Sequence, residues 1–327
     1  MKEIKELKLE DLSVKQKLGM TLTAFINGNR RTKEDDEFVL QLIKNHALGA
    51  VWVQQSNYKP QEIIDMVREA ADYPILVVTD AESGMGDYII GKHNALGCAD
   101  NEEQAYIFGK GLGITAKKMG YNIVCNPLLD ISTTGSVRSL GSDKERVAKL
   151  AAAEARGMKD AGILTLAKHY PGGNNPKQID SHMAESYSEM TKEELIEESL
   201  YPYQYLMKEG LLDGLMVGHK KFPNIDPDYP SSLSKKVIDI IRELGFDGLA
   251  TTDALCMMGI LSKYGEVECK GLALAAGIDT VLPYHKNEFS YQSLLTCYER
   301  GMISEERLDE AVRRVLQAQH KSMEPPK

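Results

Sequence analysis

Eight short apolar runs, separated by longer stretches with a helical period, recur along the sequence. This alternation is typical of an α/β fold in which helices connect parallel strands. The intervening stretches, such as KEDDEFVLQLIKNHALG and SKKVIDIIRELGFDG, place apolar residues at positions i, i+3, i+4 and i+7. Several of them end in glycine, which suits a helix C-cap. The runs are Met20–Ile26, Gly49–Gln54, Pro74–Asp80, Tyr121–Ile131, Ile163–Tyr170, Gly214–His219, Gly248–Asp253 and Asp279–Tyr284.

The chain organisation favours one domain over two. Eight strands alternate with helices over 327 residues, and no linker rich in Pro, Gly or Ser divides the chain. We therefore expect an α/β fold, a (β/α)8 TIM-like barrel, as a single domain over residues 1–327. The stretch ISEERLDEAVRRVLQAQH predicts a C-terminal helix at about 303–320, packed outside the barrel and followed by a short frayed tail.

Charge and hydropathy exclude several function classes. With 39 Lys and Arg against 48 Asp and Glu, the net charge is −9, so we expect no nucleic acid partner. No apolar stretch approaches the roughly 18 to 20 residues of a membrane span, so we expect no membrane partner. The N-terminal MKEIKELKLEDL lacks the apolar core of a signal peptide, and we expect a cytoplasmic protein.

The cysteines suggest neither disulfides nor a metal site. There are 5 of them, and no two form a CxxC pair. We interpret them as reduced, mostly buried thiols. The sequence also has no HExxH or comparable ligand spacing, so we expect no metal and no cofactor.

Polar residues mark the ends of five consecutive runs. In a (β/α)8 barrel, the catalytic residues lie at the carboxyl ends of the strands and in the loops that follow them. One or two such residues would be expected of any loop, but five in succession favour a site. The residues are Asp80, Asp130, Lys168 with His169, His219 and Asp253.

The segment LAKHYPGGNNPKQIDSHMAES, residues 166–186, is the most informative. Lys168 and His169 lie where a strand meets a loop, and the loop carries Asp180 and His182. A carboxylate two residues from an imidazole can orient it and make a proton donor and acceptor near neutral pH. By itself such a pair is more often solvated surface, but its place after a barrel strand favours catalysis.

The segment ELGFDGLATTDALCMMGI places Asp253 at the end of a buried strand. A carboxylate there can attack an electrophilic carbon or balance a developing positive charge. Asp is also a favoured N-cap residue, so Asp253 could instead cap the next helix. Position alone leaves both interpretations open.

These segments resemble glycoside hydrolase family 3, most closely its single-domain bacterial β-N-acetylglucosaminidases, along nearly the whole chain. KHYPGG followed by DSH is similar to the family's KHFPGHG followed by DSH. GFDGLATTDALCM resembles GFDGVVxSDDLxM, and MVGHKKFPNIDPDYPSSLS resembles MVAHxxYPxxDxxPATLS. VCNPLLDIS, VRSLGSD and RLDEAVRRVL resemble three further family motifs.

The resemblance implies a TIM-like barrel that cleaves terminal β-linked N-acetylglucosamine with retention of configuration. It implies that Asp253 is the catalytic nucleophile, that His182 is the general acid/base and that Asp180 is the dyad partner of His182. The resemblance also implies that five further residues line the pocket and bind the sugar. They are Asp80, Arg138, Lys168, His169 and His219.

Several departures from the family pattern fall in the pocket. DxEGGRV appears here as DAESGMGDY, GHG becomes GGN, and the second Asp after the nucleophile is Ala254. Glu82 is retained. We expect working catalytic machinery, with the leaving group and the sugar 2-substituent left open.

The resulting hypothesis is a retaining exo-β-N-acetylglucosaminidase that acts on muropeptides or chitooligosaccharides through a covalent glycosyl-aspartate. The alternatives are a β-glucosidase and a phosphorylase, since His182 would repel phosphate less than a carboxylate base would. A catalytically inactive sugar-binding barrel is an alternative of a different class. We expect a small carbohydrate as the partner and a monomer or homodimer.

Overall fold

The computed structural model describes residues 4–26, 32–54, 59–85, 101–132, 138–174, 182–283 and 286–326. Its strands form one parallel sheet in which each strand pairs with the next along the chain. The strands are β1 (Thr23–Phe25), β2 (Ala50–Trp52), β3 (Leu76–Thr79), β4 (Ile123–Val124), β5 (Leu164–Tyr170), β6 (Gly214–Val217), β7 (Leu249–Ala254) and β8 (Thr280–Leu282).

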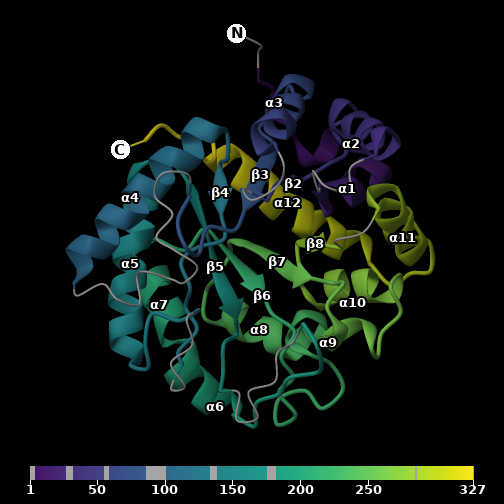
Figure 1. The fold of residues 1–327 in the computed structure, drawn as a ribbon. Coiled ribbons are helices and arrows are strands. Elements are labelled where there is room, and N and C mark those ends of the chain that lie inside the picture. The colour runs from purple at the N-terminus through teal and green to yellow at the C-terminus, as the bar shows by residue number, and fades with distance from the viewer. Residues whose placement is uncertain are drawn as a thin grey trace.

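The first and last strands meet and close the barrel. Leu22 pairs in parallel with Val281, and the Val281 amide donates to the Thr21 carbonyl at 2.9 Å. Figure 1 shows the strands at the centre of the molecule with helices around them. The (β/α)8 TIM-like barrel expected from the sequence is confirmed.

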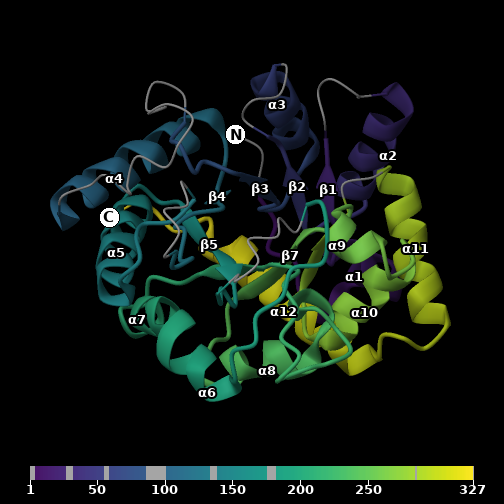
Figure 2. The ribbon, with the colours of Figure 1, turned by 60° about the horizontal axis from the view of Figure 1, so that its bottom comes forward.

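Helices form the outer layer, as Figures 1 and 2 show from two directions. They are α1 (Val14–Met20), α2 (Lys33–Lys44), α3 (Pro60–Ala70), α4 (Glu102–Met119), α5 (Lys144–Asp160), α6 (Lys192–Glu194), α7 (Tyr201–Lys208), α8 (Lys235–Glu243), α9 (Met258–Leu261), α10 (Glu268–Ala276), α11 (Asn287–Glu299) and α12 (Glu305–Lys321). Polar side chains cap several N-termini: Asn101 caps α4, Asp143 caps α5 and Ser304 caps α12. Gly120 and Gly277 end α4 and α10 in the left-handed conformation.

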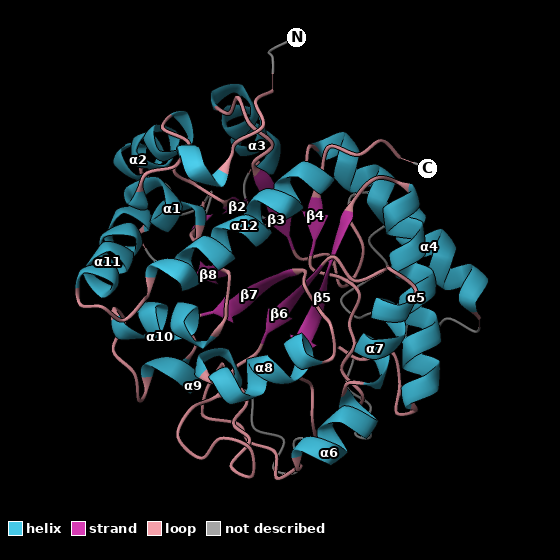
Figure 3. Cartoon of the chain, turned by 180° about the vertical axis from the view of Figure 1, so that it is seen from behind, coloured by secondary structure: helices cyan, strands magenta, loops and turns pink. Residues whose placement is uncertain are grey.

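Helix α12 crosses the end of the barrel at which the strands begin (Figure 3). The Gln319 side chain donates to the Gly49 carbonyl at 2.9 Å, just before β2. The fully buried Asp279, just before β8, accepts from Arg307 at 2.7 Å and from Arg314 at 3.4 Å. These contacts fix α12 at the end opposite the strand carboxyl ends.

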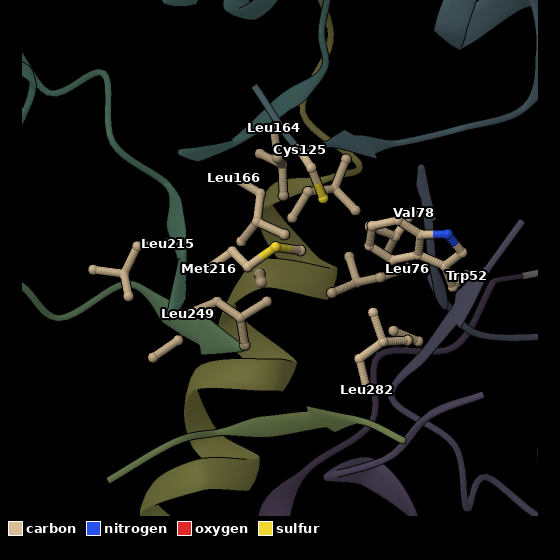
Figure 4. Packing of buried hydrophobic residues seen from close by; sticks show 14 of the residues in the cluster. Trp52, Leu76, Val78, Cys125, Leu164, Leu166, Leu215, Met216, Leu249 and Leu282 are labelled. Atoms are coloured by element: carbon tan, nitrogen blue, oxygen red, sulfur yellow. The ribbon is translucent and has the colours of Figure 1, made fainter. Parts of the chain in front are cut away.

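Apolar side chains from neighbouring strands fill the core. Figure 4 shows Leu166, Met216 and Leu249 close together, whereas Leu215 points the other way, as alternation along a strand requires. All four are at most 4% exposed. Burial on both faces explains why the strands read as apolar runs without a polar alternation.

The fourth run departs from its prediction. The sequence predicts a strand over Tyr121–Ile131, but β4 contains only Ile123–Val124. Pro127 lacks a backbone N–H and cannot continue the ladder. The chain beyond it still follows β5, because Leu128 forms an isolated bridge with Lys168.

Within the described ranges, no helix combines the length and the apolar character that crossing a bilayer requires.

Candidate active site

The predicted site residues converge on the carboxyl end of the barrel. Asp80 follows β3 directly, Lys168 and His169 lie near the end of β5, His219 lies just after β6 and Asp253 lies in β7. Parallel strands in a barrel end at the same face, so these side chains share one end of the molecule. That end is opposite α12.

Lys168 is held by two carboxylates. Its side chain is only 2% exposed, and Nζ bonds to Asp80 Oδ1 and lies 2.6 Å from Glu82 Oε1. Burial alone would lower the pKa of Lys168, but Asp80 and Glu82 raise it above its usual range. The lysine is therefore a charged donor with a fixed position.

Arg138 joins the same cluster from the loop that precedes α5. Its guanidinium donates to both oxygens of Glu82 and, at 3.1 Å, to His169 Nε2. Burial alone would raise the pKa of Glu82, but Lys168 and Arg138 lower it well below its usual range. The carboxylate of Glu82 thus orders two cations of the pocket.

His169 is fixed from its other side by Asp130. The Asp130 Oδ2 atom accepts from the His169 amide at 3.0 Å and lies 2.7 Å from Nδ1. Because Arg138 can only donate, these contacts assign the Nδ1–H tautomer to His169. The register of β5 against β6 shifts between Lys168 and Tyr170, so His169 lies where the ladder is irregular.

His219 is buried, with 1% exposure. Nε2 lies 3.1 Å from the Ala254 carbonyl, which can only accept, and Nδ1 lies 2.8 Å from the Ser232 hydroxyl. Burial lowers the pKa of His219. A neutral His219 that donates from Nε2 therefore braces the end of β7 rather than serving as a proton shuttle.

Asp253 is half-buried in β7, and its Oδ1 accepts from the Ala254 amide at 2.7 Å. Burial alone would raise its pKa, but the charges of His169 and His219 in their protonated forms, together with the Ala254 amide and Lys168, outweigh this effect and lower it. An ionised carboxylate at a strand end fits a nucleophile. The alternative role as a helix cap is wrong, because the N-cap of the next helix is Met257.

His182 is exposed, and its carbonyl accepts from the Met258 amide at 3.3 Å, which links its loop to the start of α9. The charged form of His182 lowers the pKa of His219, so the two lie within electrostatic range at one end of the barrel. Asp180, the predicted partner of His182, lies outside the described residues.

Three further residues belong to the site although the sequence analysis assigned them no role. Glu82 and Asp130 were visible as a retained family position and a strand end, but they carried no assigned role. Nothing in the sequence pointed to Lys220 except that it follows His219. Its Nζ donates to the carbonyls of Gly172 and Gly173 at 2.9 and 2.6 Å, at the base of the loop that leads to His182. Burial lowers the pKa of Lys220.

In the part of the chain that the structure describes, no group of three or more His, Cys, Asp or Glu residues is placed to hold a metal ion.

Comparison with known sequences finds one family along the chain. A model of the glycosyl hydrolase family 3 N-terminal domain matches residues 4–318. A beta-hexosaminidase of Idiomarina loihiensis is 32% identical over 273 residues, which cover 79% of this chain and 81% of that protein. A beta-hexosaminidase of Vibrio cholerae is 29% identical over 285 residues, covering 82% of this chain and 84% of that protein.

Solved structures show the same fold. A glycoside hydrolase family 3 beta-N-acetylglucosaminidase from Paenibacillus sp. superposes with a TM-score of 0.84 at 31% identity, covering 95% of this chain and 63% of that one. The beta-glucoside phosphorylase BglX bound to 2FGlc superposes with a TM-score of 0.83 at 27% identity, covering 96% and 60%. The chain thus spans about three fifths of these two longer proteins.

Proposed function

Because the chain belongs to glycoside hydrolase family 3, we propose that it removes terminal β-linked N-acetylglucosamine from muropeptides or chitooligosaccharides with retention of configuration. The observation that carries this proposal is the environment of Asp253. Its carboxylate lies at the carboxyl end of β7, and nearby imidazoles hold its pKa below the usual range despite burial. An anionic group so placed suits attack on an anomeric carbon.

In the proposed reaction, an Asp253 oxygen bonds to the anomeric carbon as the bond to the leaving oxygen breaks. His182 gives its proton to that oxygen. Water then attacks the anomeric carbon, His182 takes a proton from it, and the ester to Asp253 breaks to release the sugar. The exposure of His182 suits this role, because the leaving group must approach from solvent.

The charged cluster would bind the sugar. Asp80, Lys168, Arg138 and His169 are predicted to hydrogen-bond its hydroxyls, and their mutual contacts fix them in place before substrate arrives. Preorganised donors and acceptors of this kind lower the cost of orienting substrate. His219 would support the pocket through the Ala254 carbonyl.

The choice of N-acetylglucosamine over glucose is supported by relatives. The curated proteins of 29% to 32% identity are named beta-hexosaminidases, and one solved structure of 31% identity is a beta-N-acetylglucosaminidase. The DSH sequence with His182 is also retained. Activity on a β-glucoside is the alternative within the same chemistry.

A second candidate function is phosphorolysis, in which phosphate replaces water at the glycosyl-enzyme. A beta-glucoside phosphorylase shares the fold at 27% identity. An imidazole at the acid/base position would not repel a phosphate dianion as a carboxylate would. The product would then be a sugar 1-phosphate rather than the free sugar.

The test compares 4-nitrophenyl β-N-acetylglucosaminide with the β-glucoside, each with and without phosphate. Asp253→Asn should lose at least about a thousandfold in kcat, whereas Asp239→Asn, on the exposed face of α8, should not change it. A sugar phosphate formed only with phosphate would select the phosphorylase. Sugar binding without turnover of either glycoside would select a non-catalytic binding protein.

A further inference from the structure

Behind the site, Glu154 and Asn126 form an isolated buried pair. Glu154 lies on α5 and is 0% exposed, and Asn126, in the turn after β4, is 2% exposed. The Asn126 Nδ2 atom donates to Glu154 Oε1 at 2.8 Å. Glu154 belongs neither to the pocket cluster nor to a motif singled out in the sequence, and Asn126, in the VCNPLLDIS segment, carried no assigned role.

The two remaining side-chain oxygens of this pair both lack a hydrogen-bond donor in the part of the chain that the structure describes. Glu154 Oε2 and Asn126 Oδ1 are both buried, and neither has a hydrogen-bond partner among the described residues. If Glu154 were ionised, both atoms would be acceptors only, and two buried acceptors would lack a donor. A single proton on Oε2 would turn one of these acceptors into a donor, and the Asn126 amide offers a matching acceptor in Oδ1.

Burial supports the protonated state. It raises the pKa of Glu154 to about 8, and only the hydrogen bond from Asn126 opposes it. On the packed helix α4, Tyr106 and Lys110 bond to each other, and Tyr106 bonds to Asp160, each at 3.0 Å.

Among the residues that the structure describes, no other group supplies a charge that shifts the pKa of Glu154. On α7, burial raises the pKa of Tyr203, so Tyr203 stays neutral. Beside Asn126, burial likewise raises the pKa of Cys125. A neutral Glu154 is therefore the state that this environment favours.

The Asn126 turn is bonded to the strand that carries the pocket residues. The Leu166 amide donates to the Asn126 carbonyl at 3.1 Å, and the Lys168 amide donates to the Pro127 carbonyl at 3.1 Å. Leu129 in turn donates to the Lys168 carbonyl at 2.7 Å.

The same turn ends at Asp130, which holds His169 at both its amide and its Nδ1. The position of Asn126 therefore affects two predicted sugar-binding side chains, Lys168 and His169.

We propose that Glu154 is a positioning residue, whose protonated carboxyl pairs reciprocally with the Asn126 amide and fixes the turn that aligns Lys168 and His169. The effect on catalysis rests on the proposed function, whereas the protonation of Glu154 does not. The experiment therefore uses both kinds of readout.

Protonation is read by infrared difference spectroscopy of wild type against Glu154→Gln. A carbonyl band of a protonated carboxylic acid should be present at pH 7 in wild type only, and it should disappear as the pH rises through about 8. Absence of this band at pH 7 would overturn the proposal.

Alignment is read by the pH profile of kcat/KM. Gln at 154 can make both hydrogen bonds without a titrating proton, so Glu154→Gln should stay within about threefold of wild type at pH 7. The kcat/KM of Glu154→Gln divided by that of wild type should rise at least about threefold between pH 7 and pH 9. Only wild type loses the proton that joins residue 154 to Asn126 over this range. Glu145→Gln, exposed on the same helix, should keep the wild-type profile.

A swap separates pairing from mere packing. Asn126→Asp places two carboxyl groups together and should lower kcat/KM about tenfold. The double variant, Asn126→Asp with Glu154→Gln, again has one acid and one amide and should recover most of that loss. A double variant no better than Asn126→Asp, or identical pH profiles for wild type and Glu154→Gln, would overturn the proposal.

If no glycoside is turned over, the proposed function fails, and the alignment is read without substrate. The His169 ring signals in NMR, assigned by their loss in His169→Gln, should shift in Asn126→Asp and return in the double variant. Unchanged His169 signals in Asn126→Asp would then overturn the positioning role.

Discussion

Arg138 and Glu82 form a two-point ion pair, with Nε 2.9 Å from Oε2 and Nη2 2.7 Å from Oε1. Planar pairing of this kind fixes the orientation of a guanidinium as well as its position. The same Nη2 lies 3.1 Å from His169 Nε2, and Lys168 Nζ lies 2.6 Å from Glu82 Oε1. One carboxylate thus arranges three side chains that are predicted to bind the sugar.

Glu82→Gln should lower kcat/KM about tenfold, mostly through a higher KM. The amide cannot accept from Arg138 at both of its terminal atoms, and it carries no charge to hold Lys168. Steady-state kinetics on the N-acetylglucosaminide measure the effect, with Glu103→Gln on the exposed side of α4 as control. A kcat/KM equal to wild type would contradict the assigned role of Glu82.

The ion pairs of Glu82 should also make stability depend on pH. Lys168 and Arg138 lower its pKa below the ordinary 4.5. The unfolded state then binds more protons than the folded state as the pH falls below about 4.5, so the free energy of unfolding decreases in that direction. Thermal unfolding of wild type should therefore approach that of Glu82→Gln between pH 6 and pH 3. A constant difference across this range would contradict the prediction.

His182→Ala should lose about 10² to 10⁴-fold in kcat on a substrate with a poor leaving group. It should lose less on the 4-nitrophenyl glycoside, because nitrophenolate leaves without full protonation. The comparison requires both substrates, with His320→Ala on the exposed side of α12 as the control. Equal losses on both substrates would argue against proton donation by His182.

Lys220→Met should lower both stability and kcat. The change removes the donors to the Gly172 and Gly173 carbonyls, and each buried acceptor left without a partner costs about 1 to 3 kcal/mol. The midpoint of thermal unfolding should fall by several degrees, whereas Lys208→Met, exposed on α7, should leave it unchanged. An unaltered midpoint for Lys220→Met would show that these bonds do not hold the loop.

The order of the strands and the place of the site were accessible from the sequence, because both follow from local patterns. Apolar runs with buried faces predict strands, and their polar ends predict Asp80, Lys168 and Asp253 at one face. The length of β4 was overestimated, because the apolar run continues to Ile131, whereas the strand contains only Ile123–Val124.

The hydrogen bonds that hold the site from behind could not be predicted from the sequence. The contact of Lys220 with the Gly172 carbonyl, and that of Glu154 with Asn126, join residues 48 and 28 positions apart. Neither spacing follows a helical or strand period, so only the folded chain shows these pairs. The position of Asp180 relative to His182 stays a prediction from the sequence.

The pairing of Leu22 with Val281 has a consequence for the newly made chain. Translation delivers β1 well before its closing partner β8, which follows the other six strands in the chain. Until then, one edge of β1 has no neighbour and can pair with other chains. The barrel therefore closes only after β8 has been made, and a chain interrupted before β8 would be exposed to aggregation through the open edge of β1.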